Sequence, residues 1–254
     1  MPILEIKKLV KLFGGLAAVS KFDMYINKGE LAGLIGPNGA GKTTAFNLIT
    51  GVYEPTSGEV NFDGESIVGL KPFIINQKGM ARTFQNIRLF QDLSVLDNVR
   101  IAYHSHVKYS VFSAFFRSKA YFAEEMEIEQ KAIDFLKIFG LDHKKDELAK
   151  NLPYGEQRRL EIARALAAQP KLLLLDEPAA GMNPQETHDL MGLIAMIREK
   201  FDLTILLIEH DMSLVMGVCE RIYVLDHGTL IANGTPEEIR NNPKVIEAYL
   251  GEEA

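Results

Sequence analysis

The sequence lacks several features that would each define a class of protein. It has one cysteine, Cys219, which excludes a disulfide framework and suits a reducing compartment. The formal net charge is −6, which argues against a protein that binds nucleic acid through bulk positive charge. No apolar run approaches the roughly 20 residues that a membrane-spanning helix requires. The first residues do not follow the pattern of a signal peptide.

These absences predict a cytosolic protein without a membrane span, so any link to a membrane would have to pass through a partner. The chain also lacks internal repeats and low-complexity segments. Its 254 residues, of which 47% are hydrophobic, are enough for one large α/β domain or for a domain with an inserted lobe. We expect Cys219 to be a small buried apolar residue on a helix.

One stretch carries the most specific chemistry in the chain. Residues 36–43 fit G-x-x-x-x-G-K-[ST], the pattern of a phosphate-binding loop. A strand-like apolar segment, 31–35, precedes the pattern and a helical segment, 44–49, follows it, which is the context that the motif needs. The candidate loop residues are Gly36, Pro37, Asn38, Gly39, Ala40, Gly41, Lys42, Thr43 and Thr44.

The residue types in this loop suit a polyphosphate. Its three glycines let the backbone bend and approach a ligand closely, and successive N–H groups then form a cradle for an anion. The start of the following helix adds unpaired N–H groups and the positive end of its dipole. Lys42 supplies a positive charge for the β- and γ-phosphates, and the Thr43 hydroxyl is placed to bind Mg²⁺.

A second stretch, 171–178, delivers two carboxylates. Its continuous apolar run predicts a strand buried on both faces of a parallel sheet, and this strand ends at Asp176 and Glu177. Ligands of open α/β sheets bind beyond the carboxyl ends of the strands. Asp176 can therefore hold Mg²⁺ through water, and Glu177 can take a proton from an attacking water.

A third apolar strand, predicted over 203–208, ends next to His210 and places this histidine at the same sheet edge as the two carboxylates. We therefore regard His210 as a candidate contact of a γ-phosphate. Gln85 follows a strand predicted over 80–84. A glutamine there is ordinarily a polar boundary residue, and it gains a role only if Mg²⁺ and a γ-phosphate lie nearby.

The amino-terminal segments 3–12 and 16–26 are predicted to form two strands around a Gly14-Gly15 turn. Phe13 at this turn is either a core or turn aromatic, or a platform for an adenine ring. From 94 to about 140 the pattern is helical, and one helical face is predicted to contain Met126, Ile133 and Leu136.

Within this helical region, residues 109–117 are either a surface that faces a partner or a membrane, or apolar packing within a helical lobe. His104 and His106 are two residues apart and would not share a helical face, so we predict no metal site there. A further strong helix is predicted over 158–168, and its apolar stripe is formed by Leu160, Ala163 and Ala167.

The start of that helix is a candidate for a second anion site, because Gly155 can present bare N–H groups there. The arginines that follow are expected either to serve such a site or to form a solvated face.

Taken in order, the phosphate loop, Gln85, the segment 152–157, the segment 172–178 and His210 resemble the ATP-binding cassette of ABC transporters over the full length of the chain. Several stretches resemble, more narrowly, the ATPase subunit of branched-chain amino acid importers. They are 13–15 (FGG), 81–90 (ARTFQNIRLF), 154–164 (YGEQRRLEIAR), 178–184 (PAAGMNP), 208–212 (IEHDM) and 232–236 (ANGTP). Related importers of urea or other amides share much of this pattern.

The resemblance implies an α/β fold. This fold has a P-loop NTPase core of mainly parallel sheet with flanking helices, an N-terminal antiparallel β subdomain and an inserted α-helical lobe. We expect a single nucleotide-binding domain over 1–254. In it, 1–90 and 170–254 would form the catalytic core, and about 91–169 would form the helical subdomain with the signature motif.

The resemblance also implies ATP and Mg²⁺ as cofactors and a role for each candidate residue. Phe13 would stack on adenine, residues 38–44 would hold the phosphates, and Thr43 would bind Mg²⁺. Further roles follow for the remaining candidates: Lys42 on the β- and γ-phosphates, Gln85 as sensor of Mg²⁺ and the attacking water, Asp176 in support of Mg²⁺, Glu177 as general base and His210 on the γ-phosphate.

The partners that the resemblance implies are a second cassette, transmembrane permease subunits and, indirectly, an extracytoplasmic solute-binding protein, with no nucleic acid. Two cassettes would pair head to tail, so that Gly155 caps the γ-phosphate held by the other cassette. The chain would lie on the cytoplasmic face of the membrane through its permease, and residues 85–90 would receive a permease loop.

Two positions depart from the family pattern. The signature is usually Leu-Ser-Gly-Gly-Gln, whereas residues 152–156 read LPYGE. Pro153 has neither a hydroxyl nor a backbone N–H, so one hydrogen bond to the γ-phosphate is missing, which costs about 1–3 kcal/mol if the oxygen stays buried and unpaired. Asn183 stands where the family has the D-loop aspartate. We expect a working ATPase whose dimer closes less tightly than that of a serine-bearing relative.

Two other functions share some of these features. Non-transport ABC ATPases of DNA repair or translation carry long coiled coils or tandem cassettes, which this sequence lacks, and its negative charge also speaks against them. A small-molecule phosphoryl transferase would share the phosphate loop alone and would have no use for Gln85, the signature or His210.

Overall fold

The computed structural model describes residues 1–103, 107 and 110–250 of the chain. His104, His106 and Tyr109, which figure in the sequence predictions, lie outside the described residues. The chain divides into two compact units, one formed by Met1–Arg82 and Lys171–Ala254 and the other by Thr83–Pro170. Residues 83–90, which the sequence led us to assign to the core, group with the second unit.

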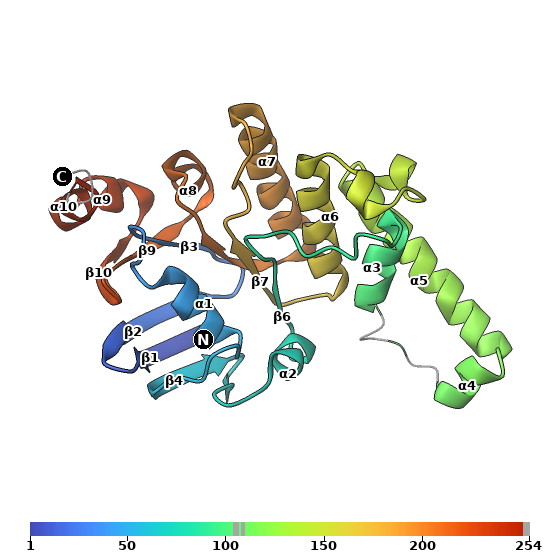
Figure 1. Ribbon diagram of the computed structural model, residues 1–254, viewed down its shortest axis with the longest axis horizontal. Helices are drawn as coiled ribbons and strands as arrows, with labels where there is room; N and C mark the ends of the chain where they lie inside the picture. The colour runs from blue at the N-terminus through green and yellow to red at the C-terminus, as the bar shows by residue number, and fades with distance from the viewer. Residues whose placement is uncertain (104–106, 108–109, 251–254) are drawn as a thin grey trace. The chain divides into compact units, whose positions relative to one another are not determined.

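The first unit is built on a six-stranded sheet with the strand order β10-β9-β3-β8-β7-β6 (Figure 1). Strands β9, β3, β8, β7 and β6 run parallel, and β10 pairs antiparallel with β9. The strands are β3 (Leu31–Ile35), β6 (Met80–Arg82), β7 (Leu172–Asp176), β8 (Thr204–Ile208), β9 (Arg221–Asp226) and β10 (Thr229–Gly234). The expected mainly parallel sheet is therefore confirmed.

The central strands of this sheet are apolar throughout. Every residue of β3, β7 and β8 is buried, which explains why their sequences are continuous apolar runs rather than an alternation of apolar and polar residues. The register pairs Asp176, at the end of β7, with Ile208, at the end of β8. These strands thus deliver the residues that follow them to one edge of the sheet.

A second sheet in this unit is antiparallel, with the strand order β2-β1-β4-β5. Its strands are β1 (Pro2–Phe13), β2 (Leu16–Asn27), β4 (Ser57–Phe62) and β5 (Glu65–Ser66). The predicted hairpin is present, with Phe13 opposite Leu16. A single hydrophobic core contains side chains of this sheet, such as Phe22 and Phe62, together with Leu174 and Leu206 of the parallel sheet.

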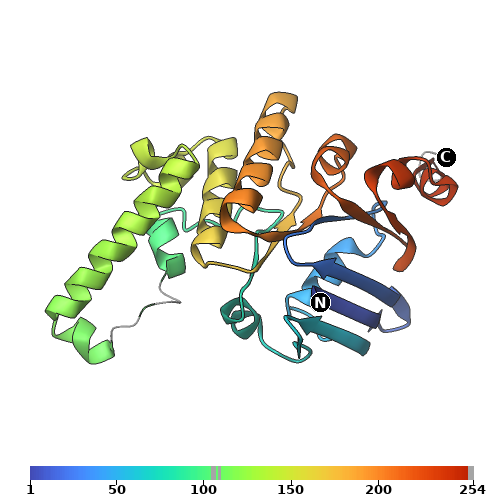
Figure 2. The same cartoon turned by 180° about the vertical axis from the view of Figure 1, so that it is seen from behind.

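The helices of the first unit are α1 (Lys42–Ile49), α2 (Pro72–Gln77), α7 (Pro184–Phe201), α8 (Met212–Val218), α9 (Pro236–Arg240) and α10 (Pro243–Leu250) (Figures 1 and 2). Asn183 is the N-cap of α7, and its side chain accepts a hydrogen bond from the Glu186 N–H at 3.0 Å. The position that departs from the family pattern therefore has a structural use as a helix cap. Cys219 is buried, as expected, but it follows α8 (Met212–Val218) instead of lying on a helix, and its burial raises the pKa of the thiol to about 12.

The second unit is helical. It contains α3 (Val95–Tyr103), α4 (Val111–Phe115), α5 (Lys119–Ile138), α6 (Tyr154–Ala167) and the short 3₁₀ helices η2 (Asp142–Lys144) and η3 (Ala149–Asn151). The helical pattern predicted from 94 to about 140 is confirmed. Within the residues that the structure describes, no helix is both long and apolar enough to cross a bilayer.

One prediction about a helix face in this unit is wrong, and one of two alternatives for Arg158 is excluded. Met126 is 71% exposed, and the buried face of α5 is formed by Ile128, Ala132 and Leu136. Arg158, for which a solvated face was one of two alternatives, is fully buried and forms an ion pair with Glu161. The Arg158 charge can be buried because the Glu161 carboxylate, one helical turn away, compensates it.

Candidate nucleotide-binding site

The phosphate-loop residues connect β3 to α1, as predicted. At Gly36, with φ of +150°, a Cβ would lie 2.0 Å from the Leu225 carbonyl oxygen. At Gly41, with φ of +99°, it would lie 2.4 Å from the Ala18 carbonyl oxygen. Both positions require glycine because the loop packs against the backbone of β9 and β2. At Gly39 a Cβ would meet no atom of the described chain within 4 Å, so this side of the loop is open to a ligand.

The loop ends at a helix start that favours an anion. The N-cap of α1 is Gly41, which has no side chain to satisfy the first N–H groups of the helix. The buried Lys42 ammonium donates hydrogen bonds to the carbonyl oxygens of Gly36, at 2.6 Å, and Pro37, at 2.8 Å. The positive charge of Lys42 is therefore already held over the loop.

The second group of candidate residues gathers where β7 and β8 end. The Glu177 N–H donates to the Ile208 carbonyl oxygen at 2.9 Å, which ties the end of one strand to the end of the other. His210 Nδ1 lies 3.6 Å from Glu177 Oε2. Because β3, β8 and β7 are neighbours in the sheet, the phosphate loop, His210 and Glu177 all leave it from the same edge. The predicted convergence of these segments at one sheet edge is present.

Glu177 has an unusual backbone conformation. Its φ is +45°, in the left-handed region that is costly for a residue with a Cβ. Its side chain is 18% exposed, so the carboxylate is partly shielded from water and still reachable. The strained turn directs the chain away from the sheet immediately after β7.

Glu209 supports this turn from inside, and the sequence analysis did not identify it. Its fully buried carboxylate accepts hydrogen bonds from the backbone N–H groups of Ala179, at 2.8 Å, His210, at 3.0 Å, and Asp211, at 3.3 Å. Burial raises the pKa of Glu209, although these N–H groups favour its charged form. The carboxylate fixes the backbone on both sides of the Glu177–His210 pair.

Asp176 has a cationic partner that the sequence analysis also missed. The guanidinium of Arg82, the last residue of β6, lies 2.6 Å from Asp176 Oδ2. It also donates to the side chains of Asn47, which lies in α1, and of Thr50, which is the C-cap of that helix. β6 pairs with β7, so a cation at the end of one strand and a carboxylate at the end of the other was the available signal. Arg82 holds Asp176 in one orientation and connects it to the helix of the phosphate loop.

The donor set at this edge fits Mg²⁺ bound together with a polyphosphate. Thr43 offers a hydroxyl and Asp176 a carboxylate, both of which are hard oxygen donors. Within the described residues, no group of three or more His, Cys, Asp or Glu side chains forms a metal site of its own. Mg²⁺ is typically held by one or two protein oxygens, with phosphate and water as the remaining ligands, and this pair suits that mode.

Phe13 lies at the end of β1 and is 44% exposed. Tyr53 contacts it edge-to-face with a centroid distance of 5.4 Å, and Lys11 Nζ lies 5.1 Å from the centre of the Phe13 ring. The core-aromatic alternative for Phe13 is therefore wrong, because a half-exposed ring is available for stacking. Tyr53 had no signal in the sequence beyond its aromatic type.

Gln85 and Gly155 belong to the second unit, where Arg158 connects their segments. Arg158 of α6 donates to the carbonyl oxygens of Phe84, at 2.6 Å, and Gln85, at 2.8 Å. Its ion pair with Glu161 measures 2.9 Å, and Glu161 accepts a further hydrogen bond from the Arg88 N–H at 3.1 Å. The helix that begins at the signature is thereby fixed to the backbone of the glutamine segment.

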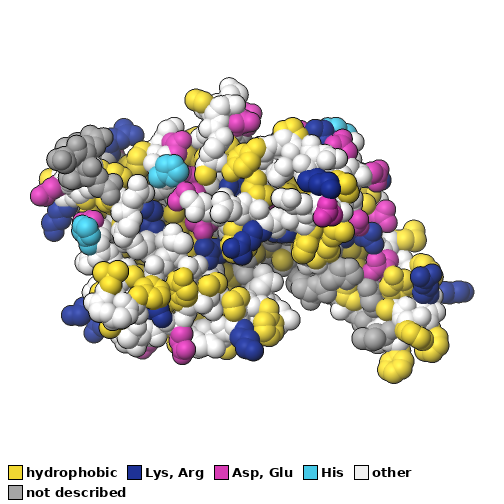
Figure 3. Space-filling view, viewed as in Figure 1, with side chains coloured by type: hydrophobic (Ala, Val, Ile, Leu, Met, Phe, Trp, Pro, Cys, Tyr) yellow, Lys and Arg dark blue, Asp and Glu magenta, His cyan; other side chains and the backbone are white. Residues whose placement is uncertain are grey.

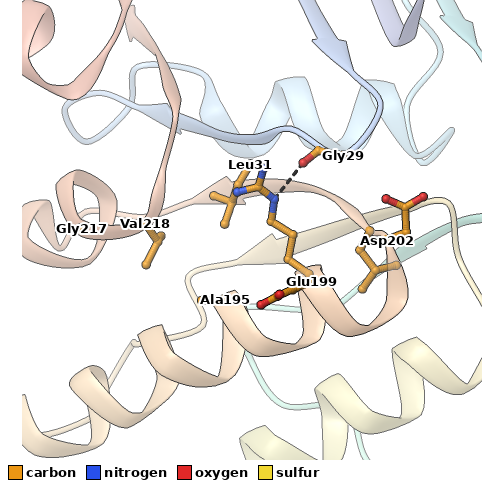
Figure 4. A pocket seen from close by; sticks show the side chains of 9 residues that line it. Gly29, Leu31, Ala195, Glu199, Asp202, Gly217 and Val218 are labelled. Carbon is orange, nitrogen blue, oxygen red and sulfur yellow. Dashed lines mark hydrogen bonds between the residues drawn. The ribbon is translucent and has the colours of Figure 1, made fainter.

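A cavity of about 520 Å³ lies at the opposite end of β3, next to Leu31, and Figure 4 shows its lining residues. Arg198, one of its lining residues, donates to the Gly29 carbonyl oxygen at 2.8 Å and to Glu220 at 2.6 Å. Since Leu31 begins β3 and the phosphate loop follows its last residue, this cavity is not part of the site at the carboxyl edge.

A phosphate loop, an Asp-Glu pair at the end of β7 and a histidine just after the neighbouring strand β8, combined in this fold, define an ATP-binding cassette. The family model described as "ABC transporter" matches residues 19–180, and the model described as "Branched-chain amino acid ATP-binding cassette transporter" matches residues 229–254. The chain therefore belongs to the ABC transporter family and is an ATPase of the cassette type.

Its curated relatives include transport ATP-binding proteins of nearly the same length. The high-affinity branched-chain amino acid transport ATP-binding protein LivG of Salmonella typhimurium is 49% identical over 251 residues, which cover 99% of this chain and 98% of that protein. LivG of Escherichia coli is 48% identical and BraF of Pseudomonas aeruginosa 47% identical, each with the same coverage.

Solved structures agree with the fold. The ADP conformation of MJ1267, an ATP-binding cassette of an ABC transporter, matches with a TM-score of 0.86 and 33% identity, covering 99% of both chains. A dimeric post-hydrolysis state of the ATP-binding cassette MJ0796, bound to ADP and Pi, matches with a TM-score of 0.77 and 25% identity, covering 92% of this chain and 98% of that one. The α/β P-loop NTPase prediction is confirmed.

Proposed function

We propose that this chain is the ATP-hydrolysing subunit of an ABC importer for branched-chain amino acids. The observation that carries the proposal is the shared sheet edge, where the phosphate loop, His210 and Glu177 follow three neighbouring strands. The substrate class is supported by the names of the LivG and BraF proteins, which are 47–49% identical over nearly the whole chain.

In this proposal ATP binds to residues 36–44, including Thr44. Its β- and γ-phosphates then accept the hydrogen bonds that the Lys42 ammonium donates to the carbonyl oxygens of Gly36 and Pro37 in the structure. The N–H groups of the loop and of the start of α1 bind the remaining phosphate oxygens. Phe13, which Tyr53 contacts edge-to-face, stacks on one face of the adenine ring.

Mg²⁺, when bound with ATP, would neutralise negative charge on the phosphates during the reaction. Thr43 and Asp176 would hold it, and Gln85 is the third residue that the resemblance to the cassette family assigns to this role. Arg82 keeps the Asp176 carboxylate in the orientation that this role requires.

For hydrolysis, Glu177 accepts a proton from a water whose oxygen attacks the γ-phosphorus. The bond from that phosphorus to the β–γ bridging oxygen breaks, and ADP and phosphate leave. His210 holds the γ-phosphate, and its distance of 3.6 Å from Glu177 keeps the two side chains on the same reacting group. Glu209 maintains both by fixing the backbone between them.

We further infer that the chain works in a head-to-tail pair with an identical or sister cassette, whose γ-phosphate is capped by Gly155. The dimeric state of MJ0796 supports this arrangement. Permease subunits would hold the pair at the cytoplasmic face of the membrane and receive solute from an extracytoplasmic binding protein. Nucleic acid has no part in this function.

Uptake of labelled leucine tests the proposal, in cells that depend on this chain and on the permease that co-purifies with it. Lys42→Ala should abolish both leucine uptake and ATP turnover, because the phosphates lose their main positive charge. Lys200→Ala, a change of an exposed lysine on α7, should leave both intact and serves as the matched control.

Other results would favour the alternatives. Uptake of urea or another amide in place of leucine would assign the chain to an amide importer. A tagged chain that co-purifies with DNA or ribosomes and without a permease would overturn the transport function.

A further inference from the structure

The turn between α4 and α5 exposes a large apolar surface. Phe112, Phe115 and Phe116 are 77%, 80% and 74% exposed, and Phe122 on α5 is 53% exposed. The rings of Phe115 and Phe116 contact each other edge-to-face at 5.2 Å. Packing within the helical lobe, one of the two uses that the sequence allowed for 109–117, is therefore wrong for these three phenylalanines. A cluster of this kind marks a surface that contacts something else.

The same turn is positively charged. Arg117 and Lys119 are exposed, and within the described residues neither takes part in an ion pair. The sequence contains no acidic residue between Asp97 and Glu124, although the whole chain carries a net charge of −6. In Figure 3 dark blue and yellow side chains lie next to one another over the α4 region, at the lower right. The surface thus combines aromatic and basic groups without an acid among them.

The turn also satisfies its own backbone. Ser110 caps α4 by accepting from the Ser113 N–H, and Ser118 caps α5 by accepting from the Tyr121 N–H. The Ser118 N–H donates to the Ser113 carbonyl oxygen at 3.0 Å, and the two serine hydroxyls are hydrogen-bonded to each other. The N–H groups of Phe116, Arg117 and Ser118 are all hydrogen-bonded within the turn, which lowers the cost of placing it in an apolar layer.

We propose that this aromatic–basic tip, formed by Phe112, Phe115, Phe116, Arg117, Lys119 and Phe122, docks on the surface of an anionic lipid bilayer. The phenylalanines enter the boundary between headgroups and acyl chains, and the two cations meet lipid phosphates. The positive charge of the tip favours an anionic lipid surface as its binding partner. A second copy of the chain, paired symmetrically through the tip, would bring Arg117 and Lys119 against the same cations of its partner.

The inference goes beyond the proposed function, because it gives the cassette a membrane contact of its own that needs neither a permease nor ATP. The contact is reversible in nature, since a few aromatic side chains and two cations bind far less tightly than a spanning helix. Each cation near an anionic surface contributes about fivefold to the binding constant, and this contribution falls as salt is added.

Co-sedimentation with vesicles tests the proposal, using the purified full chain without a permease. The chain should bind vesicles of phosphatidylcholine mixed with phosphatidylglycerol, and bind vesicles of phosphatidylcholine alone at least tenfold more weakly. The double variant R117Q/K119Q should bind the mixed vesicles about 25-fold more weakly, and F115S/F116S should lose at least tenfold. ATP turnover should be unchanged in both, which separates this result from a failure of the proposed function.

Matched controls lie in the first unit. K71Q/K200Q removes two exposed lysines and makes the same charge change, and Phe73→Ser removes a ring that is 60% exposed on α2. Both should bind vesicles like the unaltered chain. Equal binding by tip and control variants, or no binding of the unaltered chain to the mixed vesicles, would overturn the proposal. A lipid-free dimer that the tip variants convert to monomer would assign the tip to a second copy instead.

Discussion

Gly36 and Gly39 both have positive φ values, but a Cβ would overlap with neighbouring atoms only at Gly36. The two positions therefore allow the cost of the backbone conformation to be measured apart from the cost of steric overlap. An added Cβ at Gly36 would lie 2.0 Å from the Leu225 carbonyl oxygen, whereas the one at Gly39 would meet no described atom within 4 Å. Gly36→Ala must therefore move the backbone of β9, and we expect it to destabilise the fold by about 3 kcal/mol or more. Gly39→Ala carries only the conformational cost, about 1–2 kcal/mol.

Urea unfolding of the two variants measures this difference as a shift in the transition midpoint at constant slope. Equal losses of stability would mean that the loop tolerates displacement of β9, and that the close packing of Gly36 has no energetic weight.

Cys219 provides a test of burial through pH. Its pKa is raised to about 12 in the folded chain because burial disfavours the thiolate, whereas an unfolded chain would titrate near 8.5. Between these values the folded state holds the proton that the unfolded state has lost, so the free energy of unfolding falls as pH rises. Cys219→Ala should flatten this dependence above pH 9 by up to about 1.4 kcal/mol per pH unit.

The measurement is the unfolding free energy of both proteins from pH 7 to 10. A parallel pH dependence in the two would show that the thiol is accessible in the folded chain. Reaction with a thiol reagent under native conditions would lead to the same conclusion.

Single residues also show where sequence reasoning ends. Lys42, Asp176 and His210 were predictable because a motif or the end of an apolar run marks each one. Arg82 and Glu209 were not, because their importance comes from partners that only the sheet register brings together. The cation that pairs with Asp176 comes from the neighbouring strand β6. Glu209 binds backbone N–H groups, which every residue except proline has, so the sequence does not indicate which of them it contacts.

At the scale of one element, α6 depends on a buried ion pair. Arg158 and Glu161 are both removed from water and share hydrogen bonds with the backbone of 84–88. Arg158→Leu would leave the Glu161 carboxylate buried without its partner, and we expect a loss of about 3–5 kcal/mol in stability. The double change R158L/E161L should recover a large part of this loss, because it removes both charges.

Thermal and urea unfolding of the single and double variants give the coupling energy. The exposed pair of Glu127 and Lys131 on α5 is the matched control, and Lys131→Ala should cost about 0.5 kcal/mol or less. A single variant as stable as the unaltered chain would indicate that water reaches Glu161.

Elements were predictable to the extent that burial leaves a pattern. Strands β7 and β8 were found because burial on both faces makes their sequences uniformly apolar. β6 ends at Arg82, two residues before its predicted end, because only three of its residues pair with β7. The face of α5 was misassigned because Met126 is apolar and yet exposed, and hydrophobicity alone does not reveal which apolar residues have a neighbour to pack against.

At the scale of the whole molecule, we expect the signature residue Pro153 to limit how tightly two cassettes close. Pro153 is the N-cap of α6 and makes no side-chain cap hydrogen bond within the described structure. Pro153→Ser adds a hydroxyl and a backbone N–H that can bind the γ-phosphate held by the other cassette. We expect ATP-dependent dimerisation to tighten by 1–3 kcal/mol, which is about 5- to 150-fold.

Sedimentation of the ATP-bound dimer compares this variant with Asn151→Ser, which adds a serine two residues earlier. Unchanged or weaker dimerisation of Pro153→Ser would refute the account of the signature.

The division of the whole chain was predictable only in outline. A helical insert between two halves of an α/β core follows from the order of the patterns, but the segment 83–90 groups with the helical unit because Arg158 and Glu161 hold its backbone. The composition of residues 83–90 does not indicate that Arg158 and Glu161 contact their backbone.

The central claim is that the residues at the carboxyl edge of one sheet hydrolyse a single ATP, and Glu177→Gln tests it most directly. Glutamine keeps the size and hydrogen bonding of the side chain but cannot accept the proton of the attacking water. With radiolabelled ATP and Mg²⁺, the variant should bind nucleotide as tightly as the unaltered chain, show no turnover and accumulate as an ATP-bound dimer. Hydrolysis at a near-normal rate would remove Glu177 from the role of base and contradict the account.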